Sequence, residues 1–360
     1  MTDGDRYARQ RRLPMIGDEG QRRIRAGHVL LVGCGALGTA CAELLVRAGI
    51  GTLTIVDRDV VEWTNLQRQF LFDEEDARRS TPKVEAAQAR LHRINRETTV
   101  RASFDDFGPR NAERYAEGVD VIVDGLDNLE TRYLLNDLAV KRSIPYVYAA
   151  AVGTVGMTAV IRPARAGEPR RPCLRCIVPE LPPPGSLATC ESTGVLGSVT
   201  ALIAATEAAQ AIKLLVGAYE ALEPGLLSID LWRNEWRRID LTDAADPHCP
   251  CCGPCCAARS FAYLEGACMP RVTVLCGRNA VQFLPAEDSA LVDLDLLRER
   301  WEGHGVIERD EHSIACTLRS PSSADGGQLA IRVFDSGRML VHGSSDPEFA
   351  RSLIARFVGA

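Results

Sequence analysis

A glycine-rich segment, GCGALG at residues 33–38, lies between a predicted strand at 28–32 and a predicted helix that ends near Ala48. Gly33, Gly35 and Gly38 lack side chains, so backbone N–H groups can approach a phosphate, and the helix N-terminus adds partial positive charge. Asp57 follows the next predicted strand, 52–56, where a carboxylate can bind ribose hydroxyls. This pattern predicts a nucleotide site. The alternative is a glycine turn that serves only the packing of strand and helix.

Polar side chains follow this second strand in the stretch 57–69, DRDVVEWTNLQRQ. Asp59, Asn65, Arg68 and Gln69 belong to it, and a domain that binds only a dinucleotide does not need such groups there. They suit a triphosphate whose pyrophosphate leaves, because guanidinium and amide donors stabilise the developing negative charge. We therefore expect ATP as the nucleotide.

Two further residues are candidates for the same site. Lys83, one of only three lysines in the chain, opens a predicted helix at 82–93. Asp127 follows the predicted strand 119–123, at a carboxyl edge where the Mg²⁺ of a nucleotide would be bound. The alternative roles are a solvated lysine at a helix start and an N-capping aspartate.

Thirteen cysteines point to a metal site rather than to disulfides, because the N-terminal stretch lacks an apolar signal segment and we expect a reducing, cytoplasmic location. Two CxxC pairs supply four thiolates that suit a structural Zn²⁺, namely Cys173, Cys176, Cys249 and Cys252. Cys255 offers a competing CxxC pair with Cys252. Gly253 favours the pair of Cys249 and Cys252, because a glycine directly after the second cysteine is typical of a zinc turn. An iron–sulfur cluster is the alternative use of these thiols.

These motifs, together with RYARQ (6–10), TPK (81–83) and Asp127-Asn128, resemble the ThiF/MoeB/HesA family of sulfur-carrier adenylyltransferases, which are relatives of ubiquitin-activating enzymes. The resemblance covers residues 5–256. It implies that Asp57 binds the ribose and Asp127 the magnesium ion, and that four residues surround the phosphates: Asn65, Arg68, Gln69 and Lys83. It also places the zinc ligands at the chosen cysteines. Arg9 is implied to reach into the partner subunit's nucleotide site, and hence a homodimer is expected.

Cys190 is a candidate nucleophile. It precedes a predicted helix at 195–216, and a helix N-terminus lowers the pKa of a nearby thiol. Its position matches the cysteine that some family members use in thioester or persulfide chemistry. The alternative is a buried structural thiol. For Cys34 and Cys41, on the glycine segment and its helix, we expect packing roles.

The pattern of elements predicts an α/β fold. Strands alternate with helices up to about Ala149, which favours a Rossmann-like, doubly wound, mostly parallel sheet. An antiparallel extension follows at 154–161, 226–230 and 235–240, interrupted by a Pro- and Gly-rich crossing loop at 165–187 and the helix 195–216. We expect one domain at 1–257 and a small α+β domain of unassigned role at 258–360.

Composition narrows the classes of function. Hydrophobic residues make up 46% and charged residues 25%, as in ordinary globular proteins, and the net charge of -6 disfavours nucleic-acid binding. The apolar stretch 194–218 contains Glu207, Gln210 and Lys213, so we expect a buried helix and no membrane span.

The expected function is ATP- and Mg²⁺-dependent adenylylation of the C-terminal Gly-Gly carboxylate of a small ubiquitin-like sulfur carrier, with release of pyrophosphate. A sulfur donor such as a cysteine desulfurase would then allow formation of a thiocarboxylate for thiamine thiazole synthesis. Molybdopterin synthesis or tRNA thiolation is the alternative within this chemistry. An NAD-dependent oxidoreductase and a non-catalytic scaffold are alternatives of other classes. The expected catalytic residues are Arg9, Arg68, Lys83, Asp127 and Cys190.

Overall fold

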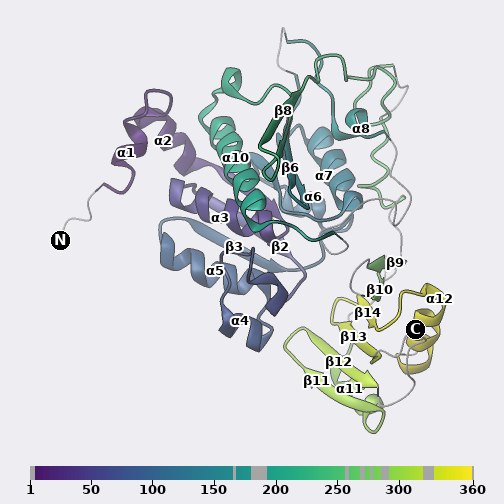
Figure 1. The fold of residues 1–360 in the computed structure, drawn as a ribbon. Coiled ribbons are helices and arrows are strands. Elements are labelled where there is room, and N and C mark those ends of the chain that lie inside the picture. Colours follow the sequence, from purple (N-terminus) through teal and green to yellow (C-terminus); the bar gives the residue numbers. More distant parts are fainter. Residues whose placement is uncertain are drawn as a thin grey trace. The chain divides into compact units, whose positions relative to one another are not determined.

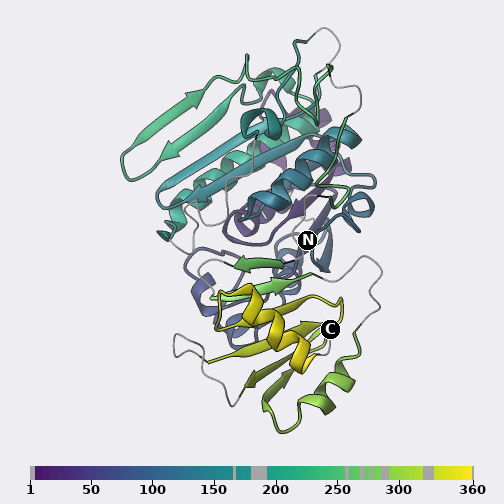
Figure 2. The same ribbon diagram turned by 90° about the vertical axis from the view of Figure 1, so that its right-hand side faces the viewer.

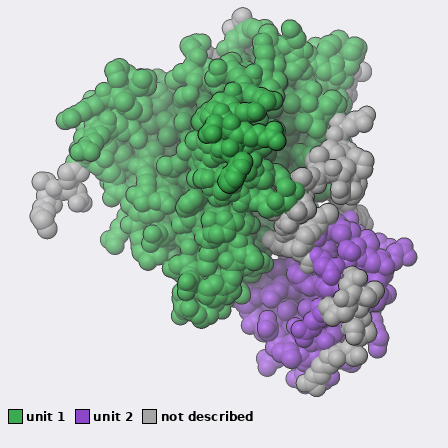
Figure 3. All heavy atoms as spheres, in the orientation of Figure 1, with its two compact units in different colours: residues 1–268 green, residues 269–360 purple. Residues whose placement is uncertain are grey.

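A computed structural model describes residues 5–164, 168–179, 193–255, 259–267, 272–275, 279–284, 292–318 and 328–358. The chain divides into two compact units, residues 1–268 and 269–360, coloured separately in Figure 3. The sequence places this boundary between residues 257 and 258. Each unit is described by itself.

The described residues of the first unit form one sheet of eight strands in the order β3-β2-β1-β4-β5-β6-β7-β8. The first five strands along the chain run parallel, and the last three extend the sheet in antiparallel fashion. The strands are β1 (His28–Val32), β2 (Thr52–Asp57), β3 (Thr99–Phe104), β4 (Val121–Asp124), β5 (Tyr146–Val152), β6 (Val155–Ile161), β7 (Leu226–Asp230) and β8 (Glu235–Ile239). This arrangement confirms the Rossmann-like fold class and its antiparallel extension.

Helices cover the sheet on both faces (Figure 1). The chain runs outward from β1 to β3 and then returns to β4, so right-handed crossovers place α3 and α7 on opposite faces. Helix α3 packs against both α5 and α10, while α7 packs against β4 and β5. The α-helices in the described part of the unit are α1 (Ala8–Arg11), α2 (Gly17–Ala26), α3 (Ala36–Ala48), α4 (Glu74–Arg79), α5 (Lys83–Ile94), α6 (Ala112–Tyr115), α7 (Leu129–Arg142), α8 (Leu174–Ile177) and α10 (Gly197–Val216).

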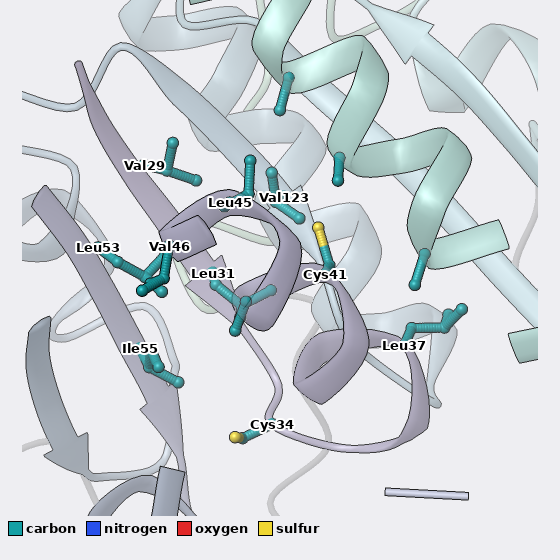
Figure 4. Packing of buried hydrophobic residues seen from close by; sticks show 14 of the residues in the cluster. Val29, Leu31, Cys34, Leu37, Cys41, Leu45, Val46, Leu53, Ile55 and Val123 are labelled. Carbon is teal, nitrogen blue, oxygen red and sulfur yellow. The ribbon is translucent and has the colours of Figure 1, made fainter. Parts of the chain in front are cut away.

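The main core surrounds α3, as Figure 4 shows. Leu45 and Val46 of α3 lie against Leu31 of β1 and Leu53 and Ile55 of β2, and none of these side chains is more than marginally exposed. The near-continuous apolar strands β1 and β2 are typical of parallel strands buried on both faces. This core fixes the loops at the carboxyl ends of β1 and β2.

Among the described residues, α10 is the helix whose length and apolar composition would allow it to cross a membrane. It packs instead against α3 and the strands β4, β5 and β6. Glu207 and Gln210 are buried within the unit, at 0% and 4% exposed. Helix α10 is therefore a core helix of this unit, as the sequence predicts.

Strand β3 is absent from the sequence-based prediction, and this is a correction. It lies at the edge of the sheet, where it pairs only with β2, from Thr52↔Thr99 to Asp57↔Phe104. Its first residues alternate between exposed and partly buried, and Arg101 interrupts the apolar pattern. An edge strand with this composition resembles a loop in the sequence. The starts of several other elements differ from the prediction by about two residues.

The described residues of the second unit form an antiparallel six-stranded sheet with two helices, in the strand order β11-β12-β13-β14-β10-β9. Helix α12 crosses the strands in Figure 2, and Trp301 lies fully buried in the core of the unit. The sequence predicts this α+β class but omits β11. The elements are β9 (Val272–Leu275), β10 (Ala280–Phe283), α11 (Leu294–Trp301), β11 (Gly305–Arg309), β12 (Ser313–Leu318), β13 (Ala330–Phe334), β14 (Met339–His342) and α12 (Pro347–Phe357).

Candidate active site

The glycine loop lies where the sheet reverses its winding, between β1 and β4, which is where doubly wound sheets bind their ligands. Gly33 has a φ of +95°, and a Cβ at this position would lie 2.4 Å from the carbonyl oxygen of Gly125. A Cβ on Gly38 would lie 2.1 Å from the carbonyl oxygen of Gly33. Tight packing of the loop therefore accounts for these glycines. It also identifies Gly125, which the sequence did not single out.

Gly35 differs from its neighbours. Among the described residues, a Cβ there would have two atoms within 4 Å, the carbonyl oxygen of Gly125 at 3.8 Å and Nε2 of Gln69 at 3.9 Å. Gly35 also precedes α3 without any side-chain cap, so the N-terminal donors of that helix face the same region. Packing alone does not require a glycine at this position, whereas a phosphate approaching the helix N-terminus does.

Asp57 ends β2 and turns its carboxylate back to the glycine loop. Its Oδ2 accepts the Cys34 backbone N–H at 2.6 Å, and its Oδ1 accepts the Asp59 N–H at 2.7 Å. Burial raises the pKa of Asp57, and the Lys83 cation opposes the rise. Each carboxylate oxygen accepts one of these bonds and has a second lone pair, which suits two ribose hydroxyls.

Lys83 begins α5 and is only 4% exposed. Its Nζ lies 3.2 Å from Oδ2 of Asp59, and its backbone N–H donates to the Asp59 carbonyl at 2.9 Å. The carbonyl oxygen of Lys83 lies 4.0 Å from Sγ of Cys34, directly beside the glycine loop. The alternative of a solvated lysine at a helix start is therefore wrong, because this ammonium group is buried next to two carboxylates.

The turn after β2 presents Arg68 and Gln69. Asn65 is 3% exposed, its Oδ1 accepts the Glu62 N–H at 3.0 Å, and its carbonyl oxygen accepts the N–H groups of both Arg68 and Gln69 at 3.0 Å. Gln69 is 4% exposed, yet its Oε1 has no hydrogen-bond partner among the described residues. Asn65 thus shapes the turn, and Gln69 holds an unsatisfied polar atom near Gly35, as expected where a ligand completes a site.

Asp127 lies between β4 and α7 with its side chain exposed. Asn128, not Asp127, caps α7, since its Oδ1 accepts the Thr131 N–H at 2.9 Å. The alternative in which Asp127 is the N-cap is therefore wrong. Among the described residues, the Asp127 carboxylate accepts one long hydrogen bond, at 3.4 Å from the Asn128 amide nitrogen. An exposed carboxylate of this kind is a ligand that magnesium prefers.

Arg58 is a charged residue of this region to which the sequence assigns no role. It bonds to Asp106 at 2.8 Å. Burial alone would lower its pKa, but the negative charges of Asp106, Asp59 and Asp127 outweigh burial and raise it. The residues that follow β2 and β4 therefore share one electrostatic environment. The sequence does carry a signal for this role of Arg58, because the residue lies between two acids in the stretch 57–59.

Cys34 and Cys41 are fully buried in the core around α3 (Figure 4), and burial raises the pKa of both thiols. Neutral, enclosed thiols are poor nucleophiles, in agreement with the packing role expected for them. Cys190 lies outside the described residues.

Arg9 lies far from the glycine loop of its own chain. Helix α1 is held at the C-terminal end of α3, because Gln10 donates to the carbonyl oxygen of Ala48 at 3.0 Å and the Tyr7 ring packs against Gly49. The glycine loop lies at the opposite end of this 13-residue helix, about 20 Å away. The Arg9 side chain is exposed.

The four selected cysteines come together at a second location in this unit. Their sulfur atoms all lie within 4.8 Å of one another, with Sγ–Sγ distances of 4.0 Å (Cys173–Cys176), 3.7 Å (Cys173–Cys249) and 3.4 Å (Cys176–Cys252). Tetrahedral zinc with Zn–S bonds of about 2.3 Å separates its sulfurs by about 3.8 Å. The competing residue Cys255 is exposed and does not belong to the group. The geometry and the donor set fit zinc.

Neighbouring side chains hold the two cysteine knuckles together. Arg170 donates to Sγ of Cys252 at 3.2 Å. Asn136 of α7, which is fully buried, accepts the Leu174 N–H at 2.7 Å and donates to Sγ of Cys251 at 3.4 Å. Such outer contacts orient metal ligands. They also join the cysteine cluster to helix α7.

Comparisons with known proteins agree with these features. Residues 7–251 match the model of the ThiF family. The sulfur carrier protein ThiS adenylyltransferase of Bacillus subtilis (strain 168) is 36% identical over 355 residues, 98% of this chain and 99% of that protein. The sulfur carrier protein adenylyltransferase of Thermus thermophilus is 38% identical over 265 residues, 73% of this chain and 96% of that protein.

The fold also resembles a solved structure. A crystal structure of Escherichia coli MccB with MccA-N7isoASN has a TM-score of 0.60 and 22% sequence identity, and the match covers 70% of this chain and 75% of that one. This likeness concerns the fold alone. The family match spans more than half of the chain, and the relative from Bacillus subtilis spans nearly all of it. The resemblance drawn from the motifs is confirmed, and the chain belongs to the ThiF family.

Proposed function

We propose that this protein is an ATP-dependent adenylyltransferase that activates the C-terminal carboxylate of a ubiquitin-like sulfur carrier. The observation that supports this most strongly is the grouping of Gly35, Gln69, Lys83 and Asp57 around the carboxyl ends of β1 and β2. A nucleotide can be held there by its ribose and phosphates. A buried lysine and a glutamine amide nitrogen beside the glycine loop suit a triphosphate better than the pyrophosphate bridge of a dinucleotide.

In the proposed reaction a carboxylate oxygen of the carrier attacks the α-phosphorus of ATP. A P–O bond to the carrier forms, the bond to the β,γ-pyrophosphate breaks, and an acyl adenylate remains on the carrier. No general base is needed, because a carboxyl group is ionised near neutral pH. The enzyme contributes orientation and charge stabilisation.

Each residue has a role in this proposal. Asp57 positions the ribose, and Asp59 positions Lys83. Three residues, Lys83, Arg68 and Gln69, donate to phosphate oxygens and stabilise the departing pyrophosphate. Asn65 shapes the turn that presents two of these donors. Magnesium would be held by Asp127 together with phosphate oxygens and would neutralise part of their charge. The adenylation step requires no enzyme thiol, and we assign Cys190 only to a later acyl- or sulfur-transfer step.

The carrier is proposed to serve thiamine thiazole synthesis. The ThiS adenylyltransferase of Bacillus subtilis is similar along the whole chain, including residues 269–360. The match to the protein from Thermus thermophilus covers only 73% of the chain. Similarity over 98% of this chain and 99% of that relative supports a ThiS-type carrier, with carriers for molybdopterin synthesis or tRNA thiolation as the alternative. A cysteine desulfurase in the same cytoplasm is the proposed sulfur donor.

Carrier-dependent ATP–pyrophosphate exchange tests the proposal. The purified chain should exchange labelled pyrophosphate into ATP when a carrier ending in Gly-Gly is present. A carrier lacking the final glycine is the matched control and should give no exchange above background. Absence of exchange with intact carrier, together with saturable nicotinamide-dinucleotide binding, would favour the oxidoreductase alternative.

A homodimer with shared sites is proposed from the position of Arg9. Arg9→Ala and Asp127→Ala chains should each be inactive alone, yet an equal mixture of the two should regain about a quarter of wild-type exchange. Half of the dimers are then mixed, and each mixed dimer holds one intact site of two. No recovery in mixed dimers verified by mass would show that Arg9 does not act across the interface.

The cysteine cluster is proposed to bind one Zn²⁺ per chain. Cys173→Ser or Cys249→Ser should lose the metal and lower the thermal midpoint by at least about 5 °C, because binding stabilises the folded state only. Cys255→Ser is the matched control and should keep both metal and stability. Elemental analysis and thermal unfolding measure these quantities. Stoichiometric iron with visible absorbance would contradict the zinc assignment.

A further inference from the structure

The turn that joins β4 to α7 is held by a buried ion pair. Asp124 ends β4 and is 0% exposed, and Arg132 lies in the first turns of α7 at 6% exposed. The Arg132 Nε lies 3.0 Å from the Asp124 Oδ2. Asp127 lies between the two in the chain, and its own carboxylate is exposed.

The pair holds the peptide groups next to Asp127. The Asp124 Oδ1 accepts the Leu126 N–H at 2.9 Å. The Arg132 Nη2 donates at 2.6 Å to the carbonyl oxygen of Leu126, which belongs to the peptide that joins Leu126 to Asp127. The same nitrogen donates at 2.8 Å to Ala149 in β5, so the turn is also tied to the sheet.

Other groups enclose this pair. The Tyr146 hydroxyl donates to the Asp124 Oδ2, and the Asp124 N–H donates at 2.9 Å to Glu207 Oε1 on α10. Burial raises the pKa of Asp124, and the Arg132 guanidinium opposes the rise. Burial and the nearby Asp124 charge raise the pKa of Glu207 well above its ordinary value, which favours the neutral acid. Arg132 is thus the cation that balances Asp124.

Stability alone does not explain this arrangement, because buried ion pairs add little over apolar side chains of similar volume. The planar guanidinium can bind a carboxylate and a carbonyl oxygen at once, which a lysine cannot do in the same geometry. We propose that Arg132 and Asp124 are positioning residues, which hold the peptide before Asp127 so that its carboxylate faces the bound nucleotide and metal ion. This inference rests on the proposed function, in which Asp127 is the magnesium ligand.

The first test needs no turnover. Mn²⁺, which prefers the same oxygen ligands as magnesium, is titrated into wild-type protein with a non-hydrolysable ATP analogue. Arg132→Met should weaken Mn²⁺ binding by about 10- to 100-fold, the usual effect of losing a group that orients a metal ligand. Arg132→Lys should also weaken it, because the bond to Leu126 is lost. Binding of the analogue without metal should change less than about twofold.

Tyr146→Phe is the matched control, since it removes a hydrogen bond from the same carboxylate but leaves both bonds to Leu126. It should keep Mn²⁺ binding within about threefold of wild type. Amide hydrogen exchange in residues 125–128 should accelerate in Arg132→Met and stay unchanged in Tyr146→Phe. If both variants lose Mn²⁺ binding in proportion to their thermal midpoints, the role of Arg132 is only structural and the proposal fails.

Catalytic measurements separate this inference from the proposed function. In wild type, exchange activity tests the function itself. In Arg132→Met, the half-saturating Mg²⁺ concentration should rise about tenfold or more while the KM for the carrier stays within about twofold. Unchanged Mg²⁺ dependence in an active wild-type background overturns the positioning role. If the wild type shows no exchange, Mn²⁺ binding and hydrogen exchange still decide whether Arg132 positions Asp127.

Discussion

Lys83→Met should slow carrier-dependent ATP–pyrophosphate exchange by at least about a hundredfold, the size of effect produced by removing one donor that stabilises a transition state. Lys83 is buried and is the cation paired with Asp59 beside the glycine loop. Its loss removes a donor for the phosphates and takes a positive charge away from Asp57 and Asp59. Initial rates at saturating ATP and carrier measure the effect. Arg68→Ala should act in the same direction through the departing pyrophosphate.

Lys141→Met is the control for this prediction. Lys141 bonds to Glu113 at 2.9 Å but is well exposed, and exposed ion pairs contribute little to stability. Exchange should stay within about twofold of wild type. Thermal unfolding of each variant shows whether the loss in Lys83→Met exceeds any loss of folded protein. A fully folded Lys83→Met with near-normal exchange would exclude Lys83 from the phosphate site.

Asp127→Asn should reduce the same exchange rate by at least about a hundredfold, because an amide cannot supply the negative charge that a magnesium ligand provides. The change is nearly isosteric, and Asn128 retains the helix cap, so the thermal midpoint should change little. Asp120→Asn, at the other end of β4, is the control and should keep exchange within about threefold. Exchange that remains near wild type in Asp127→Asn at every magnesium concentration would remove Asp127 from the metal site.

Most of the architecture follows from local patterns in the sequence. Buried parallel strands such as β1 appear as continuous apolar runs, and the glycine segment between β1 and α3 marks its own turn. Both therefore emerge from neighbouring residues alone. Strand β3 escapes this reasoning because its face is only partly covered and its pairing with β2 decides its conformation. Edge strands depend on a partner that is distant in the chain.

The candidate site was predictable in its residue types and less so in its connections. The four cysteines could be selected from spacing and the glycine that follows them. By contrast, the environment of Arg58 depends on Asp106, and that of Asn136 depends on Leu174 and Cys251. These partners are far apart in the chain and meet only after the sheet and α7 have formed. The hydrogen bond from Arg132 to the Leu126 carbonyl oxygen likewise depends on the direction in which α7 runs from the end of β4.

The most direct measurement is the intact mass of the carrier after incubation with this protein, ATP, magnesium and pyrophosphatase. Removal of pyrophosphate prevents reversal, so the acyl adenylate should accumulate. The account predicts a carrier heavier by one AMP minus water, located at its C-terminal glycine, and lost after treatment with hydroxylamine. It also predicts no adduct with Lys83→Met. An adenylyl group found on the enzyme, or a carrier of unchanged mass beside an active nicotinamide-dependent reaction, would contradict it.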